Sequence, residues 1–184
     1  MLTDKQEKWL EHLSDSDTTK ITPFNPQVKN DFLKLKKELE AIVGKDVDIT
    51  LRGSSSFGIS GKGELDIYIP VSLDRFDTIL QKLIKAYGKP GSLYPNERSR
   101  FNRFVNDTKA EVFLINSDAD GWLQLNIFED WLKNHPEDLQ QYEEFKASLE
   151  GKSGRACYTE KTAFFNSIID KASKEKSSDK VHNA

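Results

Sequence analysis

The stretch LRGSSS at residues 51–56, followed by ELDIYI at residues 64–69, decides how we interpret this chain. A strand-like run ends in a glycine–serine turn, and a second strand-like run carries two carboxylates after a short loop. Because strand side chains alternate between the faces of a sheet, Glu64, Asp66 and Tyr68 share one face and the intervening apolar residues share the other. Two acids on one polar face, beside a turn rich in backbone N–H groups, are suited to hold a divalent cation against a phosphate.

Hydrophobic periodicity predicts helices and strands on both sides of this stretch. One predicted strand precedes the glycine–serine turn and a second follows it. Two more strands form a hairpin whose turn lies at Asn106-Asp107, and from Trp122 onward the pattern is helical. A loop is predicted at 89–96, which holds two prolines and a glycine. The expected strands are 47–51, 64–69, 98–105 and 109–115, and the expected helices are 3–13, 26–43, 72–87, 122–133, 136–149 and 158–172.

Length and charge bound the class of protein. A chain of 184 residues with net charge −3 favours one domain and argues against a dedicated non-specific DNA binder. Residues 81–109 hold seven Lys/Arg against two Asp/Glu, which suits a polyphosphate substrate. The single cysteine, Cys157, excludes an intramolecular disulfide, and we find no signal peptide or membrane-length apolar run. We therefore expect a cytoplasmic protein without membrane association.

A series of short motifs runs in order from the glycine–serine turn towards the C-terminus. Gly53-Ser54-Ser55 leads to Leu65-Asp66-Ile67, and further motifs follow from Trp122 onward. These are Trp122, Phe128-Glu129-Asp130-Trp131-Leu132, Asn134-His135-Pro136, Tyr142, Phe145-Lys146, Tyr158, Lys161 and Phe164. In order and spacing, the series resembles the GrpB family, which has a nucleotidyltransferase fold. The whole series belongs to a match over residues 21–172.

The resemblance implies an α+β fold: a small mixed β-sheet flanked by helices, nucleotidyltransferase-like, with a C-terminal helical portion. We expect a single domain over residues 1–184, with an N-terminal helix and loop at 1–20 and a flexible tail at 173–184. Three departures from the family pattern bear on function. Glu64 stands where the family usually has an apolar residue, and Glu111 stands where the family strand carries a histidine. Glu129 replaces an arginine, so an anion-binding role carried by that arginine is not transferred.

Three carboxylates form the predicted metal site. Glu111 aligns with a strand position next to the acid–apolar–acid pair, where active nucleotidyltransferases carry their third metal ligand. Glu64, Asp66 and Glu111 would then hold Mg²⁺, with two ions activating an attacking hydroxyl and steadying the leaving pyrophosphate. The alternative is an ordinary amphipathic strand that shows its polar face to water.

A set of small and basic residues is predicted to bind phosphate. Gly53, Ser54 and Ser55 would offer backbone N–H groups and hydroxyls, although a plain tight turn explains them as well. Lys62 adds a cation in a glycine-flanked loop. Three arginines on the predicted hairpin are candidates for bidentate phosphate contacts: Arg98, Arg100 and Arg103. Arg103 belongs to the opposite face of its strand from the other two unless a bulge intervenes.

The preferred hypothesis is a Mg²⁺-dependent nucleotidyltransferase that moves an NMP group from an NTP to an unknown acceptor. The alternative is a non-catalytic nucleotide-binding or accessory module that interacts with a partner protein. A nucleic-acid modifier ranks last, because the sequence offers no broad basic surface. We interpret His135 as a helix cap and the aromatic residues of the C-terminal half as core.

Overall fold

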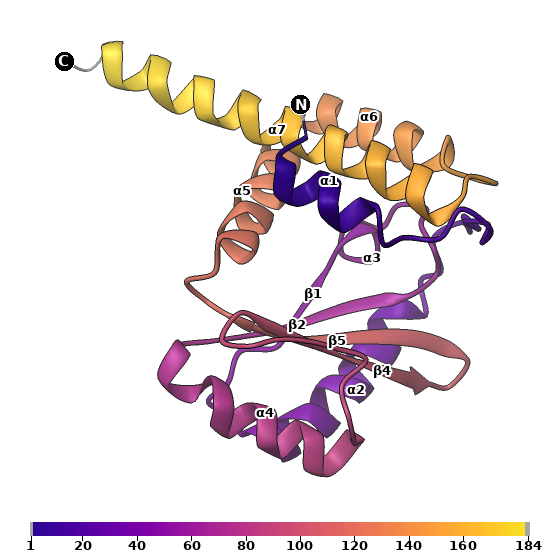
Figure 1. The fold of residues 1–184 in the computed structure, drawn as a ribbon, viewed down its shortest axis with the longest axis vertical. Helices are drawn as coiled ribbons and strands as arrows, with labels where there is room; N and C mark the ends of the chain where they lie inside the picture. Colours follow the sequence, from indigo (N-terminus) through magenta and orange to yellow (C-terminus); the bar gives the residue numbers. More distant parts are fainter. Residues whose placement is uncertain (1, 183–184) are drawn as a thin grey trace. The chain divides into compact units, whose positions relative to one another are not determined.

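The computed structural model describes residues 2–182, which divide into two compact units (Figure 1). Of the described residues, the sheet unit comprises 22–123, and the helical unit comprises 2–21 and 124–182. None of the helices within the described residues has the length and apolar character that crossing a lipid bilayer requires. The single domain inferred from the sequence stays a prediction.

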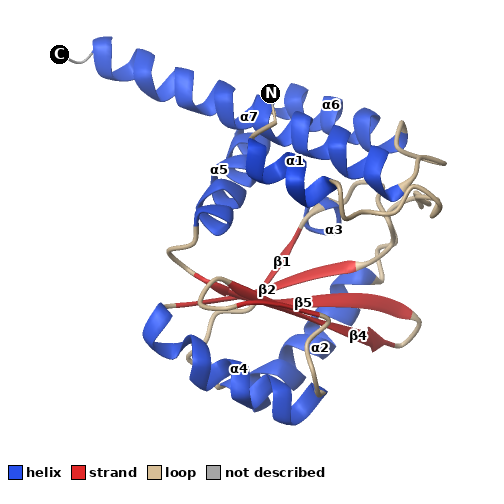
Figure 2. Ribbon diagram, viewed as in Figure 1, coloured by secondary structure: helices blue, strands red, loops and turns tan. Residues whose placement is uncertain are grey.

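The sheet unit contains a five-stranded mixed sheet with the order β1-β2-β5-β4-β3. Figure 2 labels β1, β2, β5 and β4 of this sheet. Strands β2 and β5 run parallel, and every other neighbouring pair in this sheet is antiparallel. The expected α+β fold with a small mixed sheet is thus confirmed. The strands are β1 (Thr50–Arg52), β2 (Leu65–Val71), β3 (Ser92–Tyr94), β4 (Arg98–Val105) and β5 (Thr108–Asn116).

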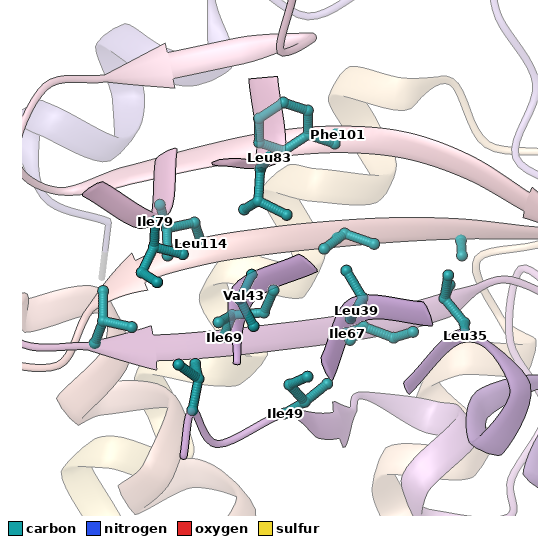
Figure 3. Packing of buried hydrophobic residues seen from close by; sticks show 14 of the residues in the cluster. Leu35, Leu39, Val43, Ile49, Ile67, Ile69, Ile79, Leu83, Phe101 and Leu114 are labelled. Atoms are coloured by element: carbon teal, nitrogen blue, oxygen red, sulfur yellow. The ribbon is translucent and has the colours of Figure 1, made fainter. Parts of the chain in front are cut away.

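Helices α2 (Val28–Val43) and α4 (Leu73–Tyr87) cover one face of this sheet (Figure 2) and close the core, whose buried side chains are drawn in Figure 3. Every second residue of β2, beginning at Leu65, is buried, as the acid–apolar alternation predicted. Apolar residues at helical spacing on α2 and α4 meet this face. The labelled side chains of this core are Leu35, Leu39, Val43, Ile49, Ile67, Ile69, Ile79, Leu83, Phe101 and Leu114. The opposite face of the sheet carries the side chains of Asp66 and Glu111, which are neighbours on β2 and β5.

The helical unit contains α1 (Asp4–Leu10), α6 (Pro136–Ala147), α7 (Gly154–His182) and most of α5 (Asp120–Asn134). Aromatic stacking supports its interior: the Phe128 ring lies 4.8 Å from that of Phe165, and the Phe145 ring lies 4.7 Å from that of Phe164. Thr3 caps α1 with a full capping box. The aromatic residues of the C-terminal half therefore act in packing.

Several predictions differ from the structure: α1 ends at Leu10 and not at residue 13, β1 begins at Thr50 and not at residue 47, and α7 begins at Gly154 and not at residue 158. The predicted loop 89–96 contains β3, which pairs with the edge of β4 and was hidden by flanking proline and glycine. Helix α7 continues to His182, so residues 173–182 are helical and the predicted end at 172 is wrong; residues 183–184 lie outside the described residues. His135 occupies the N-cap position of α6, but its ring stacks on Trp131 with the centroids 3.7 Å apart.

Asp138 joins three helices of the helical unit. Its side chain is 5% exposed, and its carboxylate accepts hydrogen bonds from Lys171 on α7 and, at 2.7 Å, from the indole N–H of Trp131 on α5. Burial alone would raise the pKa of Asp138, but the hydrogen bonds from Lys171 and Trp131 outweigh it and lower the pKa. The ionised carboxylate therefore stabilises the folded unit.

We expect Asp138→Asn to lower the free energy of unfolding by about 1–3 kcal/mol at pH 7, since the buried charge-assisted bond to Lys171 is lost. Because folding lowers the pKa of Asp138, the contribution is full above the ordinary aspartate pKa of about 4 and disappears as the pH falls through the lower folded value. Urea denaturation at pH 7 and pH 3 measures both effects. The control Asp130→Asn changes a side chain that is 69% exposed and should shift stability by less than about 0.5 kcal/mol. Equal losses in the two variants would contradict the assignment.

Candidate functional site

Three carboxylates converge on the face of the sheet opposite α2 and α4. One oxygen each from Glu64, Asp66 and Glu111 lies within 4.8 Å of the others. The parallel pairing of β2 with β5 places Asp66 directly beside Glu111, and Glu64 immediately precedes β2. Carboxylate oxygens are the ligand type that a hard divalent cation such as Mg²⁺ prefers. The three predicted metal ligands are thus brought together, while the identity of a bound metal stays a prediction.

The short helix α3 (Ser54–Phe57) holds the loop that delivers Glu64. The Ser55 hydroxyl donates a 2.9 Å hydrogen bond to the Glu64 backbone carbonyl, and the Ser56 hydroxyl donates a 2.7 Å bond to the carbonyl of Gly53. The serine run therefore joins the turn to the start of β2. Ser55, which we predicted to bind phosphate, uses its hydroxyl in this internal contact.

Gly53 lies against the Asp66 carboxylate. Its backbone has φ 69° and ψ −161°, a region that is essentially restricted to glycine. A Cβ atom built on Gly53 would lie 2.6 Å from Asp66 Oδ2. Glycine is thus required here for two reasons, its conformation and the space that the Asp66 side chain occupies.

Two cations lie among the acids. Lys109 Nζ is 2.7 Å from Glu64 Oε2 and 2.9 Å from Glu111 Oε1, and Arg100 Nη1 is 3.3 Å from the same Glu111 oxygen. Glu64 and Glu111 expose only 17% and 12% of their side chains. Partial burial would lower the pKa of Lys109, but the hydrogen bonds to both glutamates outweigh it and raise the pKa. The ammonium therefore stays charged between the carboxylates at neutral pH.

An arginine and stacked aromatic rings extend the same face of the sheet on β1, β2 and β5. Arg52 is paired with Asp66 across β1 and β2, and its guanidinium lies 4.6 Å from the ring centroid of Trp122. The ring of Tyr68 stacks on those of Phe113, at 4.7 Å, and Trp122, at 5.7 Å. These contacts give the acids a basic and apolar border.

The other predicted phosphate-binding residues lie at different places around the acids. Ser54 is 8% exposed and lines a small hollow with Phe24, Val28 and Thr108. Arg98 shares the face of Arg100, but it pairs with Ile115, near the other end of β5, and its guanidinium packs 4.7 Å from the Tyr94 ring centroid. Lys62 belongs to the loop before β2.

The structure places Arg103 on the opposite face of the sheet, so its predicted role in phosphate binding is wrong. Pairing between β4 and β5 is regular along the whole of β4, with no bulge to turn the side chain round. Arg103 instead lies 3.5 Å from Glu38 on α2 and stacks 4.2 Å from the ring centroid of Tyr87 on α4. Its guanidinium belongs to the side of the sheet that the helices cover.

Sequence reasoning missed Lys109 and Arg52 as residues of the site. Lys109 stands two positions before Glu111 on one strand, so alternation places both side chains on one face. That signal was present in the sequence. Arg52 carried a weaker signal, because its partner on β2 depends on the antiparallel register of β1.

The chain is similar to proteins of one family. A family model described as GrpB protein matches residues 18–171. Among solved structures, the crystal structure of conserved protein GrpB from Enterococcus faecalis superposes with a TM-score of 0.64 at 18% sequence identity. The match covers 85% of this chain and 98% of that chain, and at this identity it supports the fold alone. The search of curated proteins gave no match.

We expect Gly53→Ala to displace the Asp66 carboxylate and weaken Mn²⁺ binding at least about tenfold, because a Cβ would occupy the place of Asp66 Oδ2. Gly88→Ala is a matched control: Gly88 has φ 79° and ψ −160°, and a Cβ there meets nothing within 4 Å. Both variants should lose about 1–3 kcal/mol of stability from backbone strain. Calorimetric titration with Mn²⁺ separates them. Equal Mn²⁺ affinities would show that Gly53 does not position Asp66.

Proposed function

We propose that this chain, which belongs to the GrpB family, is a Mg²⁺-dependent nucleotidyltransferase that transfers an NMP group from an NTP to an acceptor. The observation that carries the proposal is the convergence of Glu64, Asp66 and Glu111 within 4.8 Å. Three carboxylates fit Mg²⁺, which prefers oxygen ligands and shares its coordination with phosphate oxygens. A bound Mg²⁺ would supply charge stabilisation for an in-line displacement at phosphorus.

The chain's own residues would divide the work around that cation. Asp66 and Glu111 come from adjacent parallel strands and give two rigidly placed ligands, and Glu64 adds a third from the loop. Arg100 and Lys109 bring positive charge to the same place and would contact the phosphate oxygens. Because the reaction needs positioning and electrostatic stabilisation, a side-chain nucleophile is not required.

The second candidate function is a non-catalytic accessory module that interacts with a partner protein. One observation favours it: Lys109 and Arg100 already pair with Glu64 and Glu111. The cluster then serves as a salt-bridge network that supports the sheet without a metal. A thermal-shift panel of NTPs with and without Mg²⁺ separates the two functions, since a ligand at 100 times its Kd stabilises by about 2.7 kcal/mol. If none of the nucleotides in the panel changes the melting temperature, the accessory module is favoured.

We expect Asp66→Asn to abolish the Mg²⁺-dependent part of ATP binding while the fold is kept, because the amide removes one of the three negative charges of the candidate metal site. Calorimetric titration of ATP, with Mg²⁺ and with EDTA, measures that part directly. Asp107→Asn is the matched control, since Asp107 lies exposed in the turn between β4 and β5. Unchanged Mg²⁺-dependent affinity in Asp66→Asn would count decisively against the transferase.

A further inference from the structure

Lys109 holds the position between two of the acids that a bound cation would take. Its Nζ lies 2.7 Å from Glu64 Oε2 and 2.9 Å from Glu111 Oε1. These are two of the three side chains whose oxygens converge in the candidate metal site. An ammonium group at hydrogen-bond distance and a divalent cation cannot both use the same oxygens at full strength.

Strand pairing brings Lys109 to this position. Ala110 on β5 pairs with Leu65 on β2, so the preceding residues, Lys109 and Glu64, meet just beyond the end of the paired segment. Lys109 and Glu111 are two residues apart on one strand and share a face. The contact of Lys109 with Glu64 and Glu111 therefore follows from the strand register, which makes the three residues close neighbours.

The backbone that carries Lys109 is held in place. Asp31 on α2 is 2% exposed and accepts hydrogen bonds of 2.7 Å from the Asn106 amide, in the β4–β5 turn, and 2.7 Å from the hydroxyl of Thr108, the first residue of β5. Lys34 adds a 3.1 Å bond to Asn106. Movement of the Lys109 ammonium therefore has to come from rotation of its own side chain.

The Lys109 side chain has room for that rotation. It is 42% exposed, whereas its partners Glu64 and Glu111 are 17% and 12% exposed. The ammonium thus reaches the acids from the solvent side on a flexible four-carbon chain. Arg100, 35% exposed, approaches Glu111 alone at 3.3 Å and leaves Glu64 to Lys109.

We propose that Lys109 is a displaceable counter-ion that occupies the cation position until a divalent cation arrives with an anionic phosphate ligand. Lys109 then rotates outward and donates its hydrogen bonds to that phosphate. The proposal rests on the metal site of the proposed function. It assigns Lys109 as the positioning residue that couples cation binding to phosphate binding and disfavours a cation that arrives alone.

Removal of the Lys109 ammonium tests this coupling with the metal alone. We expect Lys109→Met to bind Mn²⁺ about tenfold more tightly than the unmodified protein, since a competing charge is gone, and Mg²⁺-tripolyphosphate about tenfold more weakly, since a phosphate contact is lost. Paramagnetic resonance of free Mn²⁺ and calorimetry measure the two affinities. Lys133→Met, which removes a lysine that is 52% exposed and paired with Asp130, is the matched control and should change neither. Mn²⁺ binding that is unchanged or weaker in Lys109→Met overturns the proposal.

A second measurement needs no variant, so it holds even where Lys109→Met fails to fold. Mass spectrometry after brief treatment with an amine-acylating reagent reports how accessible Lys109 is. Mg²⁺ alone, at saturating concentration, should raise the acylation of Lys109 several-fold, and Mg²⁺ with tripolyphosphate should lower it again, while Lys133 stays constant. Acylation of Lys109 that does not respond to Mg²⁺ overturns the proposal.

The failure of this proposal and the failure of the transferase are distinguishable. If Lys109→Met gains Mn²⁺ affinity while Asp66→Asn keeps its Mg²⁺-dependent ATP binding, the counter-ion role of Lys109 is supported and the transferase function is contradicted. If Asp66→Asn loses that binding while Lys109→Met behaves like the unmodified protein, the transferase stands and Lys109 is an ordinary ion-pair partner.

Discussion

The parallel pairing of β2 with β5 is the constraint on which the site depends. It sets Asp66 beside Glu111 on one face while Leu65, Ile67 and Ile69 are buried on the other. A slip of one residue would turn the acids into the core and the apolar residues out of it, so burial of the apolar face fixes the register of the acids. The hydrophobic core and the candidate metal site are consequences of one alignment.

The same alignment creates an electrostatic problem that the chain solves with its own cations. Glu64 and Glu111 are largely buried, and carboxylates held close together repel one another. Lys109 and Arg100 offset this repulsion from positions that remain partly open to solvent. Such charge compensation allows the Lys109 ammonium to be replaced by another cation, because a long cationic side chain can leave without disturbing the backbone. A cluster sealed by fully buried partners would have no such freedom.

Much of this arrangement was predictable because short-range rules govern it. Alternation in residues 64–69 predicted the face of Asp66, and the hairpin over residues 98–115 predicted the separation of Arg98 and Arg100 from Arg103. The residues that escaped prediction depend on longer-range facts. Strand β3 forms because the edge of β4 accepts a partner, and Arg52 reaches its place through the register of β1. Helix α7 passes residue 172 through a polar segment whose composition gave no apolar period to follow.

The departure at Glu129 weighs less against a catalytic site than the sequence suggested. Glu129 is 1% exposed, so its side chain offers almost no surface to a ligand. Gly53, Glu64, Asp66, Lys109 and Glu111 all belong to the sheet unit. Fold similarity at 18% identity leaves the chemistry to such individual side chains. How firmly Lys109 holds its place therefore decides whether the three acids bind a metal ion or form only a salt-bridge network with Lys109 and Arg100.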